Sequence, residues 1–408
     1  MIQACLDGLP PGRLGVAVSG GGDSVALLAL MADWAVQAGV ALEAVSVDHG
    51  LRPAAAEEAA LAGRVAAQLG VPHTVLRWQG WDGSGNLQDA ARRGRRGLIA
   101  GWARDRGIPA VALGHTQDDQ AETLLMRLAR GSGVDGLAAM APRRRAQGIV
   151  WLRPLLDVPR AELRDELRAR GLPWADDPSN EDTRFDRVKA RRMLEALAPL
   201  GIERAGLAAT ARRMARARAA LEAQTVAAAQ YLAQATGWGT VRLEREGLAR
   251  QPEEIALRLL AHGLCWVARA PYRPRLVALE RLFADALAGR GGTLHGCTVT
   301  VARGDIRIMR EVAALAQITA PVGALWDGRW RVEGPEGTGL HVAALGERGL
   351  EGCANWRDTG IPRAALMATP AVWRGTALVA APVAGERSDW TARLDPGPDS
   401  FHSAILSH

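Results

Sequence analysis

The sequence predicts an α/β fold with a parallel sheet in the N-terminal part of the chain. Between residues 14 and 157, short apolar runs alternate with longer amphipathic ones, the pattern of a parallel sheet covered by helices. A glycine-rich turn joins the first apolar run to the first helix, and two polar clusters follow later strands. Because such sheets bind ligands beyond the carboxyl ends of their strands, these three clusters form the candidate site.

Five strands and four helices are expected in this part. The strands are predicted at residues 15–18, 42–48, 74–78, 110–114 and 149–152. The helices between them are predicted at residues 23–38, 54–69, 88–106 and 119–129.

From about residue 200 the pattern changes. Residues 203–235 and 252–288 are helical stretches with intermittent apolar spacing, which favours a packed helical domain over a coiled coil. Residues 291–311 indicate strands with a turn, and a strand-rich part with core tryptophans (Trp326, Trp330, Trp356 and Trp373) follows. Residues 394–400 are expected to be a loose tail. We therefore expect three domains, at residues 1–202, 203–315 and 316–408, the second mainly helical and the third a small α+β domain.

Composition limits the function classes. The chain is 48% hydrophobic and 23% charged, which is ordinary for a globular protein, and its net charge of +6 permits an acidic partner without requiring one. The four cysteines (Cys5, Cys265, Cys297 and Cys353) form no C-x-x-C pair, which disfavours a zinc ribbon, an iron–sulfur cluster or a disulfide framework. The sequence has no signal-peptide pattern and no apolar run long enough to span a bilayer, so we expect a cytoplasmic protein without a membrane partner.

The first cluster is the glycine turn, made of Ser19, Gly20, Gly21, Gly22, Asp23 and Ser24. Glycines let the backbone close around a ligand, and the N–H groups at a helix start favour an anion such as phosphate. The carboxylate of Asp23 would repel phosphate unless it held a cation, so the combination indicates a magnesium nucleotide. The segment matches neither the P-loop nor the dinucleotide glycine pattern.

The second cluster closes the second strand with Asp48 and His49, followed by Arg52. These residues are candidates for nucleotide binding, and the alternative is that they are turn residues and a helix cap.

The third cluster follows the fourth strand and contains His115, Asp119 and Glu122. The two acids are three positions apart and share one helix face, with Thr116 and Asp118 as rival caps. The alternative is that these acids only complement the helix dipole.

Longer blocks of sequence carry a resemblance to a family. The third cluster continues to Met140 through the run RLARGSGVDGL, and Arg153-Pro154-Leu155-Leu156 and Asp177-Pro178-Ser179-Asn180 follow. In ordered blocks from Ser19 to about Arg191, the chain resembles the tRNA(Ile)-lysidine synthetases, members of the PP-loop ATP pyrophosphatase superfamily. Residues 291–311 and 355–383 resemble the later domains of the same family. The resemblance implies a Rossmann-like PP-loop domain at the N-terminus.

Two basic segments extend the resemblance. Residues 87–96 resemble the family's LQ-x-AAR-x-x-R helix, whose first arginine is Arg92, and residues 185–191 resemble its F-x-RN-x-IR segment. Val188 and Ala190 depart from the second pattern. Arg187 and Arg191 lie one helical turn apart and are able to grip phosphate, although a solvated surface charge is the alternative for each arginine.

The resemblance implies an AMP-forming carbon–nitrogen ligase acting on the wobble cytidine of the CAU anticodon of isoleucine tRNA. ATP adenylates the cytidine O2 and releases pyrophosphate. The ε-amine of free L-lysine then displaces AMP at C2, which gives lysidine. The cofactors implied are ATP and Mg²⁺, and the tRNA and lysine are the partners. The sequence indicates no oligomeric state.

The implied roles follow the two steps. The ATP-binding residues would be those of the glycine turn together with Asp48, His49 and Arg92, with Asp23 placing Mg²⁺. The lysine amines would bind Asp23, Asp119 and Glu122. The proton acceptor would be one of these acids or His115. Arg92 would hold the AMP phosphate or the lysine carboxylate, and Arg187 and Arg191 would bind tRNA.

Two rival functions stay open on the sequence. A PP-loop tRNA thiolase shares the adenylation step but normally uses paired cysteines, and none of the four here is paired. In a nucleotide-dependent RNA-binding module without catalysis, Asp23, Asp119 or Glu122 would be expected to be replaced. All three acids are present.

Overall fold

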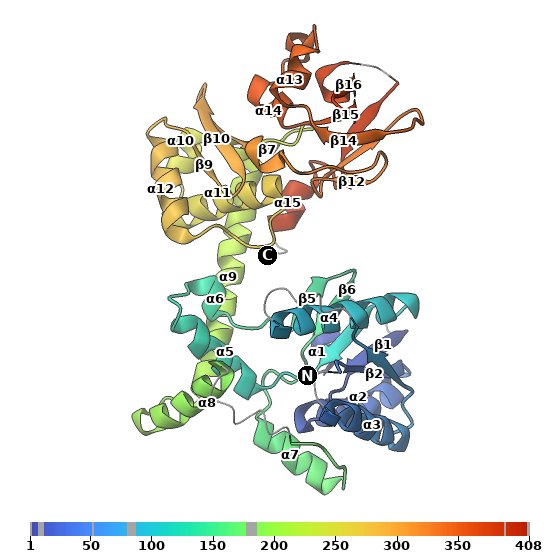
Figure 1. Ribbon diagram of the computed structural model, residues 1–408. Coiled ribbons are helices and arrows are strands. Elements are labelled where there is room, and N and C mark those ends of the chain that lie inside the picture. Colours follow the sequence, from blue (N-terminus) through green and yellow to red (C-terminus); the bar gives the residue numbers. More distant parts are fainter. Residues whose placement is uncertain are drawn as a thin grey trace. The chain divides into compact units, whose positions relative to one another are not determined.

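The computed structural model describes residues 2–6, 12–50, 53–79, 87–176, 186–386 and 389–405. The chain divides into two compact units, Met1–Arg218 and Ala219–His408, which are described separately below (Figure 1). The three domains expected from the sequence stay a prediction.

A parallel sheet is the centre of the first unit, as expected. Its strands lie in the order β3-β2-β1-β4-β6-β5, and all neighbours are parallel except β5 and β6. The strands are β1 (Arg13–Ala17), β2 (Ala41–Asp48), β3 (His73–Arg77), β4 (Ala110–Leu113), β5 (Arg143–Ala146) and β6 (Ile149–Leu152). The five expected strands are confirmed. The edge strand β5 was not expected, because its sequence RRRA has no apolar alternation.

Helices cover both faces of this sheet. The helices of the first unit are α1 (Ile2–Leu6), α2 (Gly22–Ala38), α3 (Pro53–Gln68), α4 (Leu87–Asp105), α5 (Gln117–Leu128), α6 (Val134–Leu137), α7 (Arg160–Ala169) and α8 (Asp186–Leu197). One face packs against α2, α3 and α7 through residues such as Leu28, Val65 and Leu163. The opposite face packs against α4 through Ile99 and Trp102 (Figure 1).

The strand order explains why two of the predicted clusters meet. The chain proceeds from β1 to β2 and β3 on one side, and β4 and β6 lie on the other side of β1. Strands β1 and β4 are therefore neighbours, with Ala17 opposite Leu113. The glycine turn and the segment after β4 both leave the sheet at this reversal of strand order, where open α/β sheets bind their ligands.

Gly114 lets these two segments approach each other. A Cβ atom at this position would lie 2.9 Å from the carbonyl oxygen of Asp23 and 3.0 Å from the Cα atom of Ser24. Both contacts are with backbone, which cannot move aside as a flexible side chain does.

We expect Gly114→Ala to lower the free energy of unfolding by about 1–3 kcal/mol, because the added methyl group overpacks the strand end. Gly101→Ala in α4 is the matched control, since its Cβ would have nothing within 4 Å. The control should gain about 0.5–1 kcal/mol from the higher helix propensity of alanine. Urea unfolding measures both variants, and equal midpoints would contradict the expectation.

The second unit begins within the long helix α9 (Arg204–Leu232). An antiparallel sheet follows, in the order β7 (Ala233–Ala235), β8 (Val241–Glu244), β11 (Asp305–Arg310), β10 (Cys297–Ala302) and β9 (Gly292–Leu294). The helices α10 (Arg245–Ala249), α11 (Glu253–Ala268) and α12 (Leu276–Leu287) belong to the same part. The single helical stretch expected at residues 252–288 is thus two helices, because Pro271 and Pro274 interrupt it. Cys297 is buried in this core, and burial raises the pKa of its thiol to about 12, so it is a packed side chain.

Two three-stranded sheets make up the rest of the unit. One contains β12 (Leu325–Trp326), β13 (Trp330–Glu333) and β17 (Thr391–Leu394), and the other contains β14 (Leu340–Ala344), β15 (Pro370–Arg374) and β16 (Ala377–Ala380). The short helices are α13 (Gly346–Glu351), α14 (Arg363–Met367) and α15 (Ser400–Ala404). Trp326, Trp330 and Trp373 are buried, as expected, and Trp356 is half-buried.

The expectation of a loose tail is wrong for the described residues. Phe401 is fully buried, and its carbonyl oxygen accepts a hydrogen bond of 2.7 Å from Nε2 of His262. Trp266 also donates its indole N–H to Oγ of Ser400, at 3.1 Å. Glycine- and proline-rich sequence around residue 397 suggested disorder, but aromatic packing after it orders the segment.

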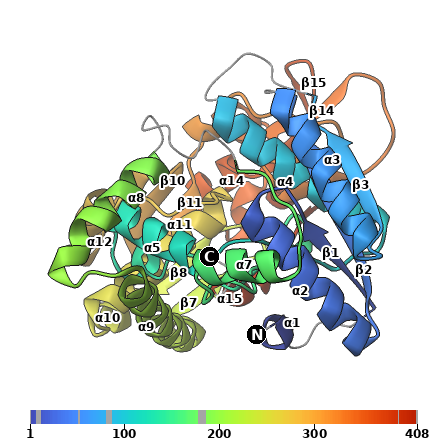
Figure 2. The same cartoon turned by 90° about the horizontal axis from the view of Figure 1, so that it is seen from below.

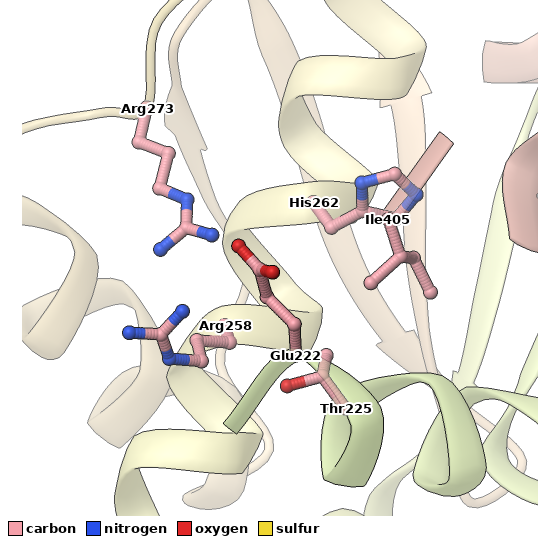
Figure 3. Close-up of a pocket in the computed structure, with 6 residues that line it drawn as sticks. All are labelled: Glu222, Thr225, Arg258, His262, Arg273 and Ile405. Atoms are coloured by element: carbon pink, nitrogen blue, oxygen red, sulfur yellow. The ribbon is translucent and has the colours of Figure 1, made fainter. Parts of the chain in front are cut away.

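A small polar cavity is lined in part by His262, which contacts Phe401. Its volume is about 10 Å³, and it is lined by Glu222, Thr225, Arg258, His262, Arg273 and Ile405. Figure 3 shows the guanidinium groups of Arg258 and Arg273 on the same side of the Glu222 carboxylate, Arg273 above and Arg258 below. This volume holds at most one water and is too small for a larger ligand. Within the described residues, no helix is both long and apolar enough to cross a membrane.

Candidate active site

The glycine turn is closed by the side chain of Ser24. Its Oγ accepts a hydrogen bond from the backbone N–H of Ser19 at 3.0 Å and donates to the carbonyl oxygen of Gly21 at 2.8 Å. Ser24 is accordingly buried and shapes the turn. Helix α2 then starts at Gly22 without a side-chain cap. Its first-turn N–H groups therefore suit an anionic ligand.

Close neighbours explain two of the glycines, a backbone oxygen at Gly20 and a tryptophan side chain at Gly22. Gly20 has a φ of +85°, and a Cβ there would lie 2.7 Å from the carbonyl oxygen of Glu58 in α3. A Cβ at Gly22 would lie 3.3 Å from the indole ring of Trp174. The N–H of Ala175 donates to the carbonyl oxygen of Gly20 at 2.9 Å, so the segment after α7 holds the turn from outside.

Thr116, rather than Asp118, caps helix α5. Asp119 and Thr116 form a capping box, in which Oδ2 of Asp119 accepts hydrogen bonds from the N–H of Thr116 at 2.9 Å and from its hydroxyl at 3.1 Å. Asp118 instead accepts a hydrogen bond of 2.8 Å from the backbone N–H of Arg160. One oxygen of Asp119 is thus used locally, and Oδ1 is turned toward other partners.

Asp23, Asp119 and Glu122, which we call the three-acid cluster, converge on Arg160. Nε of Arg160 donates to Oδ2 of Asp23 at 2.9 Å. Its Nη2 lies 3.6 Å from Oδ1 of Asp119, and its Nη1 lies 3.9 Å from Oε1 of Glu122. The structure therefore brings together the three acids that the sequence placed in two separate clusters.

Helix α8 adds two further cations, and it lies beside α5 (Figure 2). Nη1 of Arg187 lies 3.4 Å from Oδ1 of Asp119, and Nε of Arg191 donates to Oε1 of Glu122 at 3.0 Å. The two arginines predicted to bind tRNA are therefore next to the acids predicted to bind lysine. Their role in tRNA binding stays a prediction.

The surroundings of the three acids shift their pKa values in different directions. Burial raises the pKa of Asp23, although Arg160 opposes it, and burial also raises the pKa of Glu122 against the opposing charge of Arg191. Burial alone would also raise the pKa of Asp119. The positive charges of Arg187 and Arg160 outweigh burial, so the pKa of Asp119 is lowered. Glu122 is therefore a stronger base than Asp119.

His115 and Glu122 each carry a buried atom that lacks a partner. Within the described part of the chain, Oε2 of Glu122 accepts no hydrogen bond and Nδ1 of His115 has no hydrogen-bond partner. A buried polar atom left unpaired costs about 1–3 kcal/mol, so each of these atoms is suited to a ligand. Burial also lowers the pKa of His115 to about 3, which keeps its ring neutral.

The other residues predicted to bind the nucleotide are Asp48, His49 and Arg92. Oδ1 of Asp48 accepts a hydrogen bond from the N–H of Gly50 at 2.9 Å, which is the turn role left open by the sequence, and His49 belongs to the same turn. Arg92 is exposed on α4, and its charge helps to lower the pKa of His115. Arg52, Phe185 and the Asp177-Pro178-Ser179-Asn180 block lie outside the described residues.

Few side chains of the site are suited to bind a metal ion. Among the described side chains, no group of three or more His, Cys, Asp or Glu residues is arranged to hold a metal ion. Magnesium in nucleotide sites commonly uses one or two carboxylates and takes its other ligands from phosphates and water. Asp23, the acid of the glycine turn and part of the first turn of α2, fits that role as a single protein ligand.

Arg160 is the site residue that the sequence reasoning missed. It stands four positions after the Arg153-Pro154-Leu155-Leu156 block and directly after Pro159, at the start of α7. Proline before a helix marks a helix start, but nothing in the local pattern separates this arginine from the many others. Its partner Asp23 is 137 positions away in the chain.

Comparisons with known proteins agree with this geometry. Residues 2–197 match the model of a family described as the PP-loop domain. The chain is 52% identical over 407 residues to the tRNA(Ile)-lysidine synthase of Ruegeria pomeroyi, covering 100% of this chain and 97% of that one. It is 45% identical over 280 residues to the tRNA(Ile)-lysidine synthase of a Methylobacterium species, covering 68% of this chain and 80% of that one.

Two solved structures are more distant. The U34-tRNA thiolase NcsA from Methanococcus maripaludis has a TM-score of 0.44 and 17% identity, and the match covers 50% of this chain and 71% of that chain. The NMN synthetase from Francisella tularensis has a TM-score of 0.34 and 13% identity, covering 48% and 81%. At these values neither structure carries an argument about this chain.

Proposed function

The chain belongs to the tRNA(Ile)-lysidine synthase family, and from this premise we propose how its residues perform the reaction. The enzyme is an ATP-dependent ligase that forms lysidine on isoleucine tRNA. The observation that carries the assignment of roles is the three-acid cluster beside the glycine turn, with Oε2 of Glu122 buried and without a donor in the described chain.

The first step is adenylation of the wobble cytidine of the CAU anticodon. The cytidine O2 attacks the α-phosphorus of ATP, and the bond to pyrophosphate breaks. The backbone from Ser19 to Gly22 and the start of α2 would hold the pyrophosphate, while Ser24 keeps the turn closed. Mg²⁺, held by Asp23, would neutralise the phosphate charge when bound. Arg92 would hold the AMP phosphate or the lysine carboxylate, and Asp48 and His49 would border the nucleotide.

The second step joins lysine to the activated base. The ε-amine attacks C2 of the cytidine, the C2–O2 bond breaks, and AMP leaves with O2. The amine must lose a proton before or during this attack. Glu122 is the favoured acceptor, because burial raises its pKa and Oε2 has no donor within the described residues. His115, with a pKa of about 3, is a weaker acceptor.

Recognition of the tRNA requires more surface than this pocket offers. Arg187 and Arg191 lie one turn apart on α8 and would bind phosphates near the anticodon. Residues 203–408 would contact the rest of the tRNA, as the net charge of +6 allows. A cytoplasmic location stays a prediction.

One assay tests the function. The protein is incubated with ATP, Mg²⁺, labelled lysine and an isoleucine tRNA transcript with a CAU anticodon. We expect label on the tRNA and AMP release that depends on lysine. A transcript with the wobble cytidine replaced by uridine is the control and should stay unlabelled. Absence of label from the CAU transcript under every condition would overturn the proposal.

A further inference from the structure

Arg160 is anchored to helix α5, which carries two of the acids. It is the first residue of α7, and its backbone N–H donates to Oδ2 of Asp118 at 2.8 Å. Asp118 directly precedes Asp119, so the start of α7 is tied to the first turn of α5. The side chain of Arg160 is only 21% exposed. Its position is therefore set by the packing of two helices and not by solvent.

The guanidinium group of Arg160 reaches one oxygen of each acid. These oxygens are Oδ2 of Asp23, Oδ1 of Asp119 and Oε1 of Glu122, at 2.9, 3.6 and 3.9 Å. Arg187 contacts Asp119, and Arg191 contacts Glu122. A planar guanidinium with several fixed N–H donors suits such a shared position better than an ammonium group does.

These contacts decide which carboxylate oxygens stay available. Both oxygens of Asp119 are engaged, Oδ2 by Thr116 and Oδ1 by the arginines. Glu122 receives Arg160 and Arg191 on Oε1, and its Oε2 is buried without a donor in the described residues. Holding one oxygen of a carboxylate orients the other. Arg160 thus helps to present Oε2 of Glu122 as an acceptor for an incoming ammonium group.

We propose that Arg160 is a positioning residue for lysine, which holds the three acids together and orients Glu122 toward the amine. The inference rests on the proposed lysine site. Asp23, Asp119 and Glu122 repel one another when ionised, and the guanidinium group of Arg160 contacts all three. The enzyme keeps Arg160 in place when lysine binds, because lysine uses the oxygen of Glu122 that Arg160 does not contact.

The test separates lysine binding from adenylation. The full chain with Arg160→Gln is assayed for the KM for lysine at saturating ATP, Mg²⁺ and CAU tRNA, and for pyrophosphate release without lysine. We expect the KM for lysine to rise about tenfold or more, while pyrophosphate release stays within about threefold of the wild-type rate. Pyrophosphate release should be little affected, because a magnesium nucleotide would itself neutralise Asp23. The KM for lysine should rise, because Asp119 and Glu122 lose the cation that they share.

Two further variants complete the test. Arg160→Lys keeps the charge but not the planar fork, so its KM for lysine should lie between those of the wild type and Arg160→Gln. Arg168→Gln is the control, because Arg168 is exposed on the same helix and pairs with the exposed Asp165. Its KM for lysine and its rate of pyrophosphate release should equal those of the wild type. If thermal unfolding shows that Arg160→Gln does not fold, Arg160→Lys carries the test.

Specific outcomes would overturn the inference. A KM for lysine that is unchanged in both Arg160 variants would remove the positioning role. A lower KM would mean that Arg160 competes with lysine, and an equal loss in both steps would place its role in adenylation. In each of these cases the wild type still makes lysidine, so the proposed function stands. Failure of the wild type to label tRNA would instead overturn the proposed function.

Discussion

Replacing Asp23 with asparagine is expected to lower the rate of tRNA adenylation about 100- to 1,000-fold, since the variant loses the carboxylate that would place Mg²⁺. Asparagine keeps the size of the side chain, so the glycine turn should stay closed through Ser24. Pyrophosphate release in the presence of ATP, Mg²⁺ and CAU tRNA measures this step directly. The Mg²⁺ concentration that gives half the maximal rate should rise in the same variant.

Asp33→Asn provides the control for this prediction. Asp33 is on the same helix α2, and it is exposed and paired with Arg170 at 2.7 Å. Its loss should leave both steps of the reaction unchanged. Adenylation by Asp23→Asn at the wild-type rate, with an unchanged need for Mg²⁺, would show that Asp23 does not take part.

Replacing Glu122 with glutamine is expected to slow the lysine-dependent step about 100-fold or more, the usual contribution of a positioned proton acceptor. Adenylation should continue, so adenylated tRNA should accumulate. Glutamine is a better choice than alanine, because Glu122 is 1% exposed and alanine would leave a cavity beside Arg160 and Arg191. Transfer of labelled lysine to pre-adenylated tRNA in a single turnover isolates the step.

The pH dependence adds a second measurement on Glu122. Since burial raises the pKa of Glu122, the wild-type lysine step should fall on acidification at a higher pH than an ordinary glutamate would give. The Glu122→Gln variant should lack this fall. Glu195→Gln on α8 is the control, because Glu195 is 64% exposed. A lysine step of normal rate and pH profile in Glu122→Gln would exclude Glu122 as the acceptor.

Local sequence patterns were sufficient for most of the first unit. The five predicted strands and their helices follow from apolar runs and amphipathic stretches. Four of these strands, β1, β2, β4 and β6, are mostly buried, and burial against both faces of a sheet leaves a strong signal. The arginine-rich edge strand β5 was missed, because an edge strand needs few apolar residues. The tail was misjudged for a related reason: Phe401 packs against residues far away in the chain.

The sequence by itself determined which chemistry is present, and the tertiary structure decided how it is assembled. The glycine turn and the acids of α5 were identified from motifs, because turn and helix geometry depend on neighbouring residues. The strand order then placed β1 beside β4, and only this brings Asp23 to Asp119 and Glu122. Arg160 enters from α7, and its ion pairs join segments that share no local pattern. The glycine turn and the acids could therefore be predicted, but the cation that holds the acids together required the fold.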